Sequence, residues 1–308
     1  MPSVIALACR LAALLLALAW PTSSVSAHDH DVLVLGRISD DPRVHYQQLQ
    51  PLLDYVVPRM ADVGIREGRI LMARDAQQMA SYLRRGRVDW VTETAATAVL
   101  LRQRADARPL LLTERDGVST YHSVFFARRD SGVGSLADLP GRSIAFQRPS
   151  STSAYFAPAS ELVALGFKLD ILLSPLDRVE APAVGYVFAR SELNIATWVH
   201  KRLVDVGVMS HLDWNNPRRM PDSFRRDFVL IGRTADYPRA VELVRGDLSP
   251  EIAMRLREVL LAAADDPTAG PALRTFFGTS RFLPIDAGSE QALDRLAAGV
   301  ARVRLDVE

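Results

Sequence analysis

Short apolar runs that alternate with segments of helical spacing constrain the fold of this chain more than any other feature. Three such runs occupy the N-terminal third, and a segment with apolar residues three and four positions apart follows each of them. Strands are expected at 31–36, 69–72 and 88–92, and helices at 49–57, 76–85 and 95–104. Because strand–helix–strand order places parallel strands in one sheet with helices on its faces, the pattern predicts an α/β fold.

A second series of the same kind follows the long aromatic segment at 120–127. Strands are expected at 143–146, 185–188 and 203–208, a strand returning to the first lobe at 227–232, and helices at 192–201, from 248 and at 292–303. The chain exceeds the usual size of one compact core, so two lobes are expected. Each should be a mostly parallel sheet flanked by helices, and crossing strands should join them. We assign 31–125 and 230–308 to lobe I and 126–229 to lobe II.

Residues 1–27 have the pattern of a secretory signal peptide. One arginine precedes an apolar run at 11–20, and small residues end the segment at Ala27. The apolar run is too short to span a bilayer, so cleavage after Ala27 and a periplasmic location are expected. The sole cysteine, Cys9, falls in this segment, which excludes disulfides and cysteine-held metals from the mature chain.

The expected mature N-terminus begins His28-Asp29-His30. A free amine with histidine at the third position can bind Cu(II) or Ni(II) in a square-planar set of nitrogens. A disordered polar end is the commoner structure for such a terminus. No other histidine spacing indicates a metal site, and no cofactor is predicted.

The charge balance excludes some classes of partner. Without residues 1–27, which hold one arginine and no acid, the 37 basic and 36 acidic residues become 36 of each. Such a chain is not expected to bind nucleic acid or an anionic membrane. An enzyme is not expected either, because no Gly-x-Ser-x-Gly elbow, zinc motif or nucleotide-binding glycine loop is present.

The segment 150–153, which we call the hydroxyl segment, is the strongest candidate site. Ser150, Ser151, Thr152 and Ser153 lie between the expected strand at 143–146 and helical spacing at 159–165. The first amides of a helix have no intrahelical acceptor and carry partial positive charge, so they favour an oxyanion. The hydroxyl groups could add further donors. The alternative is that one of these residues is an ordinary N-cap.

Polar residues also follow two of the expected strands in the first lobe. Arg37 lies in the loop after the first strand, and Glu93 and Thr94 lie between the third strand and its helix. In open α/β sheets the loops at the carboxyl ends of the strands line the crevice that holds ligands. These residues are therefore candidates for ligand contact.

Three motifs, at 121–132, 135–146 and 149–153, resemble the phosphate/phosphite/phosphonate substrate-binding proteins of bacterial ABC importers. That family has the type 2 periplasmic binding protein fold. The resemblance implies that Ser151, Thr152 and Ser153, with the Tyr121 hydroxyl, hold the oxyanion. It also implies that Asp205 holds a ligand amine, and that Glu93, Thr94 and Glu192 match one subfamily. Two positions depart from the family pattern, Ala154 in place of glycine and Arg148 in place of an acid.

The resemblance implies a monomeric solute receptor that closes on a small oxyanion and delivers it to an ABC permease. The alternative function is sensing, with a membrane histidine kinase as partner. The charges leave the ligand open. Arg148 favours a highly charged or inorganic anion, whereas the three carboxylates, at 93, 192 and 205, favour a zwitterion or a protonated oxyacid.

Overall fold

The computed structural model describes residues 31–307. The expected signal peptide, Cys9 and the proposed metal ligands His28 and His30 lie outside the described residues. Within residues 31–307, no helix combines the length and the apolar character needed to cross a bilayer.

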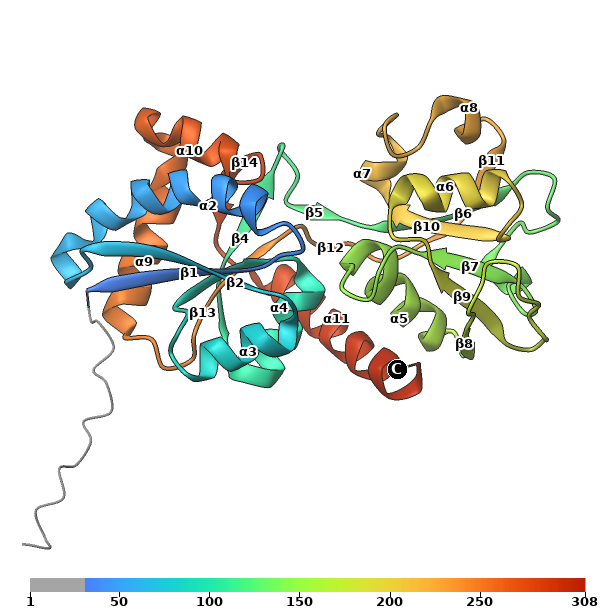
Figure 1. Cartoon of the computed structure of the whole chain (residues 1–308), viewed down its shortest axis with the longest axis horizontal. Helices are drawn as coiled ribbons and strands as arrows, with labels where there is room; N and C mark the ends of the chain where they lie inside the picture. The colour runs from blue at the N-terminus through green and yellow to red at the C-terminus, as the bar shows by residue number, and fades with distance from the viewer. Residues whose placement is uncertain (1–30, 308) are drawn as a thin grey trace, which may run out of the picture. The chain divides into compact units, whose positions relative to one another are not determined.

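The first lobe is built on a six-stranded sheet with the order β14-β4-β13-β3-β1-β2 (Figure 1). β2, β1 and β3 pair in parallel, as the alternating pattern predicts, and β13, β4 and β14 extend them in antiparallel fashion. The strands are β1 (Val32–Ile38), β2 (Glu67–Ala73), β3 (Trp90–Glu93), β4 (Arg108–Arg115), β13 (Val241–Val244) and β14 (Thr279–Leu283).

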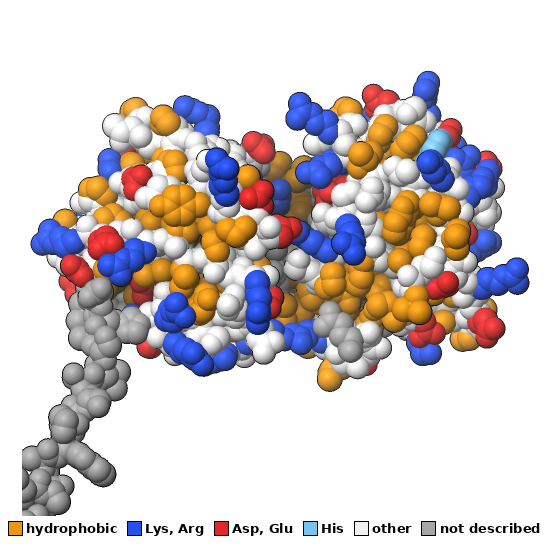
Figure 2. Space-filling view, viewed as in Figure 1, with side chains coloured by type: hydrophobic (Ala, Val, Ile, Leu, Met, Phe, Trp, Pro, Cys, Tyr) orange, Lys and Arg blue, Asp and Glu red, His pale blue; other side chains and the backbone are white. Residues whose placement is uncertain are grey.

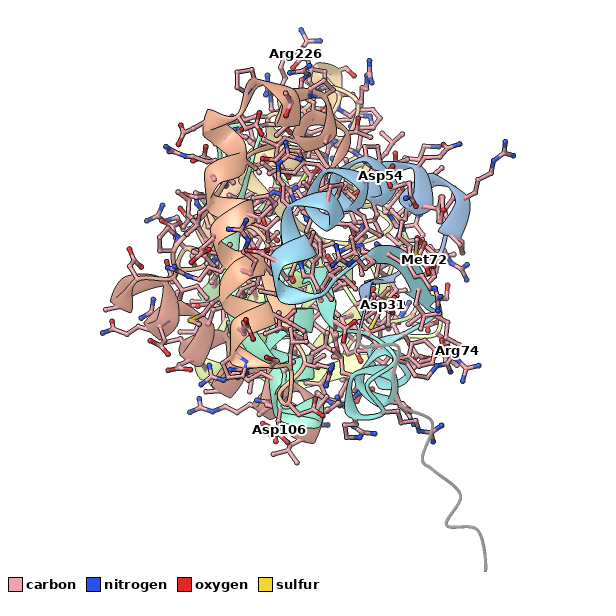
Figure 3. The ribbon with its side chains drawn as sticks, turned by 90° about the vertical axis from the view of Figure 1, so that its left-hand side faces the viewer. Asp31, Asp54, Met72, Arg74, Asp106 and Arg226 are labelled. Atoms are coloured by element: carbon pink, nitrogen blue, oxygen red, sulfur yellow. The ribbon has the colours of Figure 1, made fainter. Side chains whose placement is uncertain are left out.

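Helices cover both faces of this sheet. One face packs against three helices, α2 (Pro42–Val56), α9 (Pro250–Ala262) and α10 (Gly270–Thr275), and the other against α3 (Ala76–Arg84) and α4 (Ala95–Ala105). Figure 3 shows α2 and α9 over the first of these faces, with Asp54 on the solvent side of α2. Short helical turns η1 (Val57–Val63), η4 (Ala263–Asp265) and η5 (Pro267–Ala269) complete the lobe.

The second lobe has a sheet with the order β11-β6-β10-β7-β9-β8. β10, β7, β9 and β8 are parallel to one another. β6 pairs antiparallel with β10, and β11 pairs antiparallel with β6. Its strands are β6 (Ser123–Arg128), β7 (Ser143–Phe146), β8 (Leu169–Ile171), β9 (Val184–Phe188), β10 (Val206–Ser210) and β11 (Phe228–Arg233). Its helices are η2 (Leu136–Asp138), η3 (Thr152–Phe156), α5 (Ala157–Ala164), α6 (Glu192–His200), α7 (His211–Trp214) and α8 (Asp222–Arg225).

The expectation that the strand at 227–232 returns to the first lobe is wrong. β11 pairs with β6 inside the second sheet, where it covers an edge of β6 that would otherwise have unpaired amides and carbonyls. The expected lobe boundaries at 125/126 and 229/230 consequently fall inside β6 and β11. We propose that the two lobes divide instead in the connections near 122 and 234.

Crossing strands connect the two lobes. The expected strand at 120–127 is divided at His122 into β5 (Thr120–Tyr121) and β6, and β5 pairs antiparallel with β12 (Tyr237–Pro238) outside both large sheets. The C-terminal helix α11 (Ala287–Asp306) packs against both α4 and α5. Gly299 permits the close packing of α11 on α5, because a Cβ at that position would lie 2.6 Å from the hydroxyl oxygen of Ser160 in α5.

Candidate ligand-binding site

The carboxyl ends of the parallel strands carry most of the predicted site residues. In the first lobe Arg37 lies within strand β1, next to its last residue Ile38, and not in the expected loop. Glu93 is the last residue of β3, and Thr94 is the N-cap of α4. In the second lobe β7 leads into the hydroxyl segment and β9 leads to Glu192. The surface is hollowed between the two lobes in the view of Figure 2.

Ser151 is an ordinary helix N-cap, the simpler of the two alternatives. Its hydroxyl oxygen accepts a hydrogen bond from the Ala154 amide at 3.1 Å. The helix starts earlier than the expected residue 159, with a π-helical turn over Thr152–Phe156 in which Ala154 is non-helical (φ −117°, ψ 22°). Turns of this kind often mark functional sites in helices. Ser150 lies exposed in the preceding turn.

Thr152 points from the second lobe to the start of a helix in the first. Its side chain is buried, and its hydroxyl oxygen accepts a hydrogen bond from the amide of Ala96 at 3.0 Å. Ala96 lies in the first turn of α4, whose N-cap Thr94 makes no side-chain capping bond. The hydroxyl oxygen of Thr152, from the second lobe, is therefore the acceptor for the Ala96 amide, which has no acceptor within its own helix.

Tyr121 and Ser153 are held together at the crossing strands. The Tyr121 hydroxyl hydrogen bonds with the Ser153 side chain, and the Ser153 carbonyl accepts a hydrogen bond from the Ser123 hydroxyl at 2.6 Å. The Tyr237 ring packs edge-on against Tyr121 with 4.6 Å between centroids. Burial raises the pKa of Tyr121, so its phenol stays protonated and can donate.

Arg37 and Glu93 pair with each other. The Nη1 atom of Arg37 lies 3.2 Å from Oε2 of Glu93 and donates to the Thr92 carbonyl at 2.7 Å. The other carboxylate oxygen of Glu93 accepts from the Ile38 amide at 2.9 Å. Both oxygens of this buried carboxylate thus have partners in the protein, which leaves Glu93 poorly placed to hold a ligand amine.

Glu192 is also engaged inside its own lobe. Its carboxylate accepts hydrogen bonds from Gln147 Nε2 at 2.7 Å and from Arg219 Nη1 at 3.1 Å. Burial, and next the negative charge of Asp213, raise its pKa above the ordinary value of a glutamate. Arg148 extends from the same edge to Asp40 of the first lobe, with 2.6 Å between Nη1 and Oδ2.

The structure separates Asp205 from the other predicted site residues. It precedes β10, so it lies at the amino ends of the parallel strands, at the opposite edge of the sheet from the hydroxyl segment. There its carboxylate accepts from the amide of Ser143 at 2.9 Å and from the Ser143 hydroxyl at 3.0 Å. The expectation that Asp205 holds a ligand amine is not met, because its oxygens fix the start of β7.

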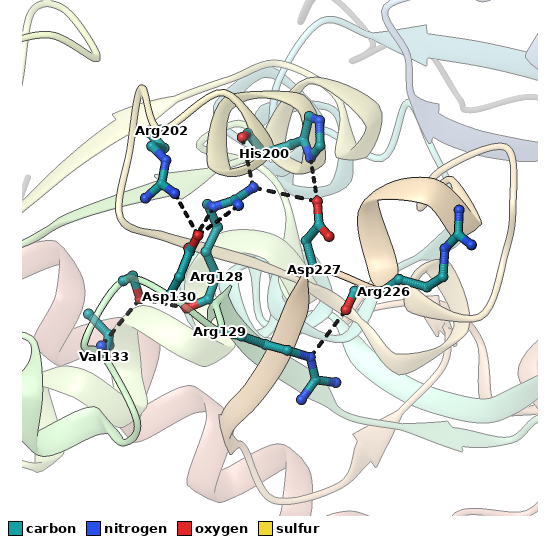
Figure 4. A network of polar contacts seen from close by, with 9 residues as sticks. Arg128, Arg129, Asp130, Val133, His200, Arg202, Arg226 and Asp227 are labelled. Atoms are coloured by element: carbon teal, nitrogen blue, oxygen red, sulfur yellow. Dashed lines mark hydrogen bonds and ion pairs between the residues drawn. The ribbon is translucent and has the colours of Figure 1, made fainter.

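The amino-end edge of the second sheet carries a further structural network (Figure 4). Arg128, at the end of the antiparallel strand β6, lies 2.9 Å from Asp130 and 3.6 Å from Asp227. Asp130 also pairs with Arg202 at 2.6 Å, and His200 lies 3.4 Å from Asp227. These pairs hold β6 and β11 to the loop after α6, far from the hydroxyl segment.

Replacing Asp205 with alanine is expected to lower the free energy of unfolding by about 1–3 kcal/mol, because the Ser143 amide and hydroxyl lose their acceptor. Ligand affinity should not change, since the residue lies at the opposite edge of the sheet. Urea denaturation and calorimetry with the wild-type chain would check both results. Asp205→Asn, which keeps an acceptor oxygen, is the control, and a weakened ligand affinity in Asp205→Ala would return this residue to the site.

The structure also reveals two charged residues that the sequence analysis missed. Arg115 and Glu242 are buried at the carboxyl edge of the first sheet. Glu242 accepts hydrogen bonds from Trp90 Nε1 at 2.6 Å and from the hydroxyls of Thr92 and Thr113 at 2.8 and 2.6 Å. Glu242 lies within the apolar run 240–244, so only its charge could have drawn attention to it, and Arg115 lies in the polar stretch that ends β4. In the described part of the chain, no group of three histidine, cysteine or acidic side chains could hold a metal ion.

Two α/β lobes connected by paired crossing strands, with polar residues at facing carboxyl edges, define a two-lobed ligand-binding protein. The chain belongs to the family described as ABC transporter, phosphonate, periplasmic substrate-binding protein, whose model matches residues 37–289. Its function is accordingly to bind a small solute in the periplasm for an ABC permease.

Solved structures share this fold. XAC2383 from Xanthomonas citri, bound to chloride ion, is 56% identical, with a TM-score of 0.85 over 90% of this chain and 100% of that chain. The same protein bound to ATP is 55% identical over the same shares, also with a TM-score of 0.85. PhnD1 from Prochlorococcus marinus, in complex with methylphosphonate, is 17% identical with a TM-score of 0.61 over 88% and 99%, which shows a shared fold.

Proposed function

We propose that the protein captures a phosphate-type oxyanion, such as phosphate, phosphite or a phosphonate, between its two lobes. The observation that carries the proposal is the hydrogen bond from the Ala96 amide of α4 to the Thr152 hydroxyl. It brings a helix start of one lobe to the hydroxyl segment of the other, and both elements can donate to anionic oxygens. Tyr121, protonated and hydrogen bonded to Ser153, supplies a further donor.

The engagement of the carboxylates favours an anion over a zwitterion. Glu93 and Glu192 are paired within their own lobes, and Asp205 lies at the opposite edge of its sheet. A ligand amine would have to displace one of these partners, whereas an oxyanion needs only donors. The highly similar XAC2383 bound to chloride ion and to ATP supports an anionic ligand that includes phosphoryl groups.

The mechanism is binding coupled to closure of the lobes, in which the ligand shifts the population toward the closed form. The crossing strands β5 and β12 are the segments about which such a closure would turn. We further propose that the receptor acts as a monomer after removal of residues 1–27, without enzymatic activity. A sensing function with a membrane kinase would use the same site. Stimulation of a reconstituted permease ATPase would separate import from sensing.

Replacing Thr152 with alanine is expected to weaken binding of the cognate anion by about 1–3 kcal/mol, because one hydroxyl at the site is lost. Isothermal titration calorimetry with phosphate, phosphite, methylphosphonate, arsenate and sulfate would first identify the ligand and then measure the loss. Thr152→Ser, which keeps the hydroxyl, is the matched control and should bind within a few-fold of wild type. Equal affinities of wild type and Thr152→Ala for every ligand that binds would contradict the proposed site.

A further inference from the structure

Three arginines gather at the carboxyl edge of the first sheet, and we call them the arginine cluster. Arg37 and Arg115 lie against one aromatic ring, with their guanidinium carbons 4.9 and 4.7 Å from the centroid of Phe277. The guanidinium carbon of Arg239 lies 4.9 Å from the centroid of Tyr121. Arg37 and Arg239 are both close enough to Arg115 to disfavour its positive charge.

The nearby carboxylates do not balance these three positive charges. Glu93 pairs with Arg37, and its second oxygen is occupied by the Ile38 amide. Glu242 gives its oxygens to three neutral donors, and burial raises its pKa above the ordinary value of a glutamate. Among the described residues, at most two carboxylates, Glu93 and Glu242, face the three arginines. The cluster therefore carries more positive than negative charge.

The guanidinium groups themselves are incompletely satisfied. Arg115 is 6% exposed, its Nε atom has no hydrogen-bond acceptor among the described residues, and burial lowers its pKa to about 9. The Nε atom of Arg37 is buried and equally without an acceptor there. Within residues 31–307, the guanidinium of Arg239 has neither a carboxylate partner nor a hydrogen-bond acceptor, and it is partly exposed. Uncompensated buried charge of this kind is costly, and an anionic ligand would offset the cost.

Tyr121 connects this cluster to the hydroxyl segment. Its ring lies against Arg239, and its hydroxyl hydrogen bonds with Ser153. A phosphoryl group bound at the hydroxyl segment would therefore be separated from the guanidinium of Arg239 by the side chain of Tyr121. A guanidinium matches a second phosphoryl group well, because its planar donors can bond two oxygens at once.

We propose that the arginine cluster is a second anionic subsite, so that the ligand carries at least two linked phosphoryl groups. One group is held at the hydroxyl segment, and the next is bound by Arg239, with Arg115 and Arg37 stabilising its charge from behind. This inference rests on the proposed function, since it needs the first phosphoryl group at Thr152. Inorganic pyrophosphate and a nucleoside polyphosphate share this chemistry.

Calorimetry with the mature chain tests the subsite, using phosphate, pyrophosphate, ATP and AMP as probes. Pyrophosphate or ATP should bind at least tenfold more tightly than phosphate or AMP. Arg239→Gln should weaken binding of the diphosphoryl probe at least tenfold more than binding of phosphate. The matched control is Arg233→Gln, an exposed arginine near the same connection, which should affect all four probes alike.

The outcomes separate the two proposals. If Thr152→Ala weakens binding but Arg239→Gln affects phosphate and pyrophosphate equally, the second subsite is wrong and the oxyanion site stands. If pyrophosphate and ATP bind no more tightly than phosphate, the subsite is likewise wrong. If Thr152→Ala changes no affinity, the proposed function itself fails. If ATP binds tightly and pyrophosphate does not, the recognised ligand is a nucleotide. If both probes bind tightly, the linked phosphoryl groups are the recognised feature.

Discussion

Replacing Glu242 with alanine is expected to lower the free energy of unfolding by about 3–5 kcal/mol, the loss typical of removing one partner from a buried charged network. Trp90, Thr92 and Thr113 would lose their common acceptor in a region where Glu242 is fully buried. Arg115 would lose a neighbour that favours its charge. Urea denaturation followed by circular dichroism measures the effect.

Glu242→Gln is the matched control for this prediction. The glutamine keeps one oxygen acceptor, but its amide group places a donor against another donor, so an intermediate loss is expected. If Glu242→Ala costs less than about 1 kcal/mol, the hydrogen bonds to Trp90 and the two threonines contribute little. The order of stability, wild type above glutamine above alanine, is the result that supports the network.

Replacing Phe126 with alanine is expected to cost about 3–5 kcal/mol of stability, the usual range for deleting a buried aromatic ring. Phe126 is fully buried in the second lobe, and its ring centroid lies 5.2 Å from those of both Trp214 and Phe228. A cavity left there would separate α7 from β11. Chemical denaturation monitored by tryptophan fluorescence would measure the loss.

Gly207 provides an internal check on the Phe126 prediction. A Cβ at this position would lie 2.7 Å from the Ile195 Cγ2 atom and closer still to the ring of Phe126, so Gly207→Ala should cost about 1–3 kcal/mol. The same substitution should cost less in a Phe126→Ala background, because the ring it meets is gone. Strictly additive losses would show that the two residues do not share this contact.

The alternating pattern predicted the parallel part of the first sheet correctly, and it found β7, β9 and β10 of the second sheet but not β8. β1, β2 and β3 fall where apolar runs were found, and α3 and α4 follow as expected, because local hydrophobic periodicity reflects burial directly. The pattern could not place β11, whose composition is typical of a buried strand in either lobe. Its pairing with β6 depends on which sheet edge was free, and that is a property of the assembled fold.

The candidate site residues likewise fall into those that the sequence could place and those that only the structure placed. The position of the hydroxyl segment, Arg37 and Glu93 at the carboxyl edges of the sheets could be predicted, because that edge follows from strand order. Asp205 was misassigned because its motif matches the family while its position before β10 places it at the opposite edge. Arg115 and Glu242 were missed because a charge inside a strand gives no sign of its partners until the sheets are assembled.

The sequence by itself determined the fold class, the family and the segment that would present hydroxyl groups at a helix start, because these follow from local periodicity and from short motifs. Only the tertiary structure decided that Ser151 caps its own helix while Thr152 reaches the amide of Ala96. It also decided that the carboxylates have partners inside the protein, whereas the buried Nε atoms of Arg37 and Arg115 have no acceptor among residues 31–307. The polar groups that remain for a ligand are those without a hydrogen-bond or ion-pair partner in the protein. Most of these partners are far apart in the sequence, so only the folded structure shows which groups meet.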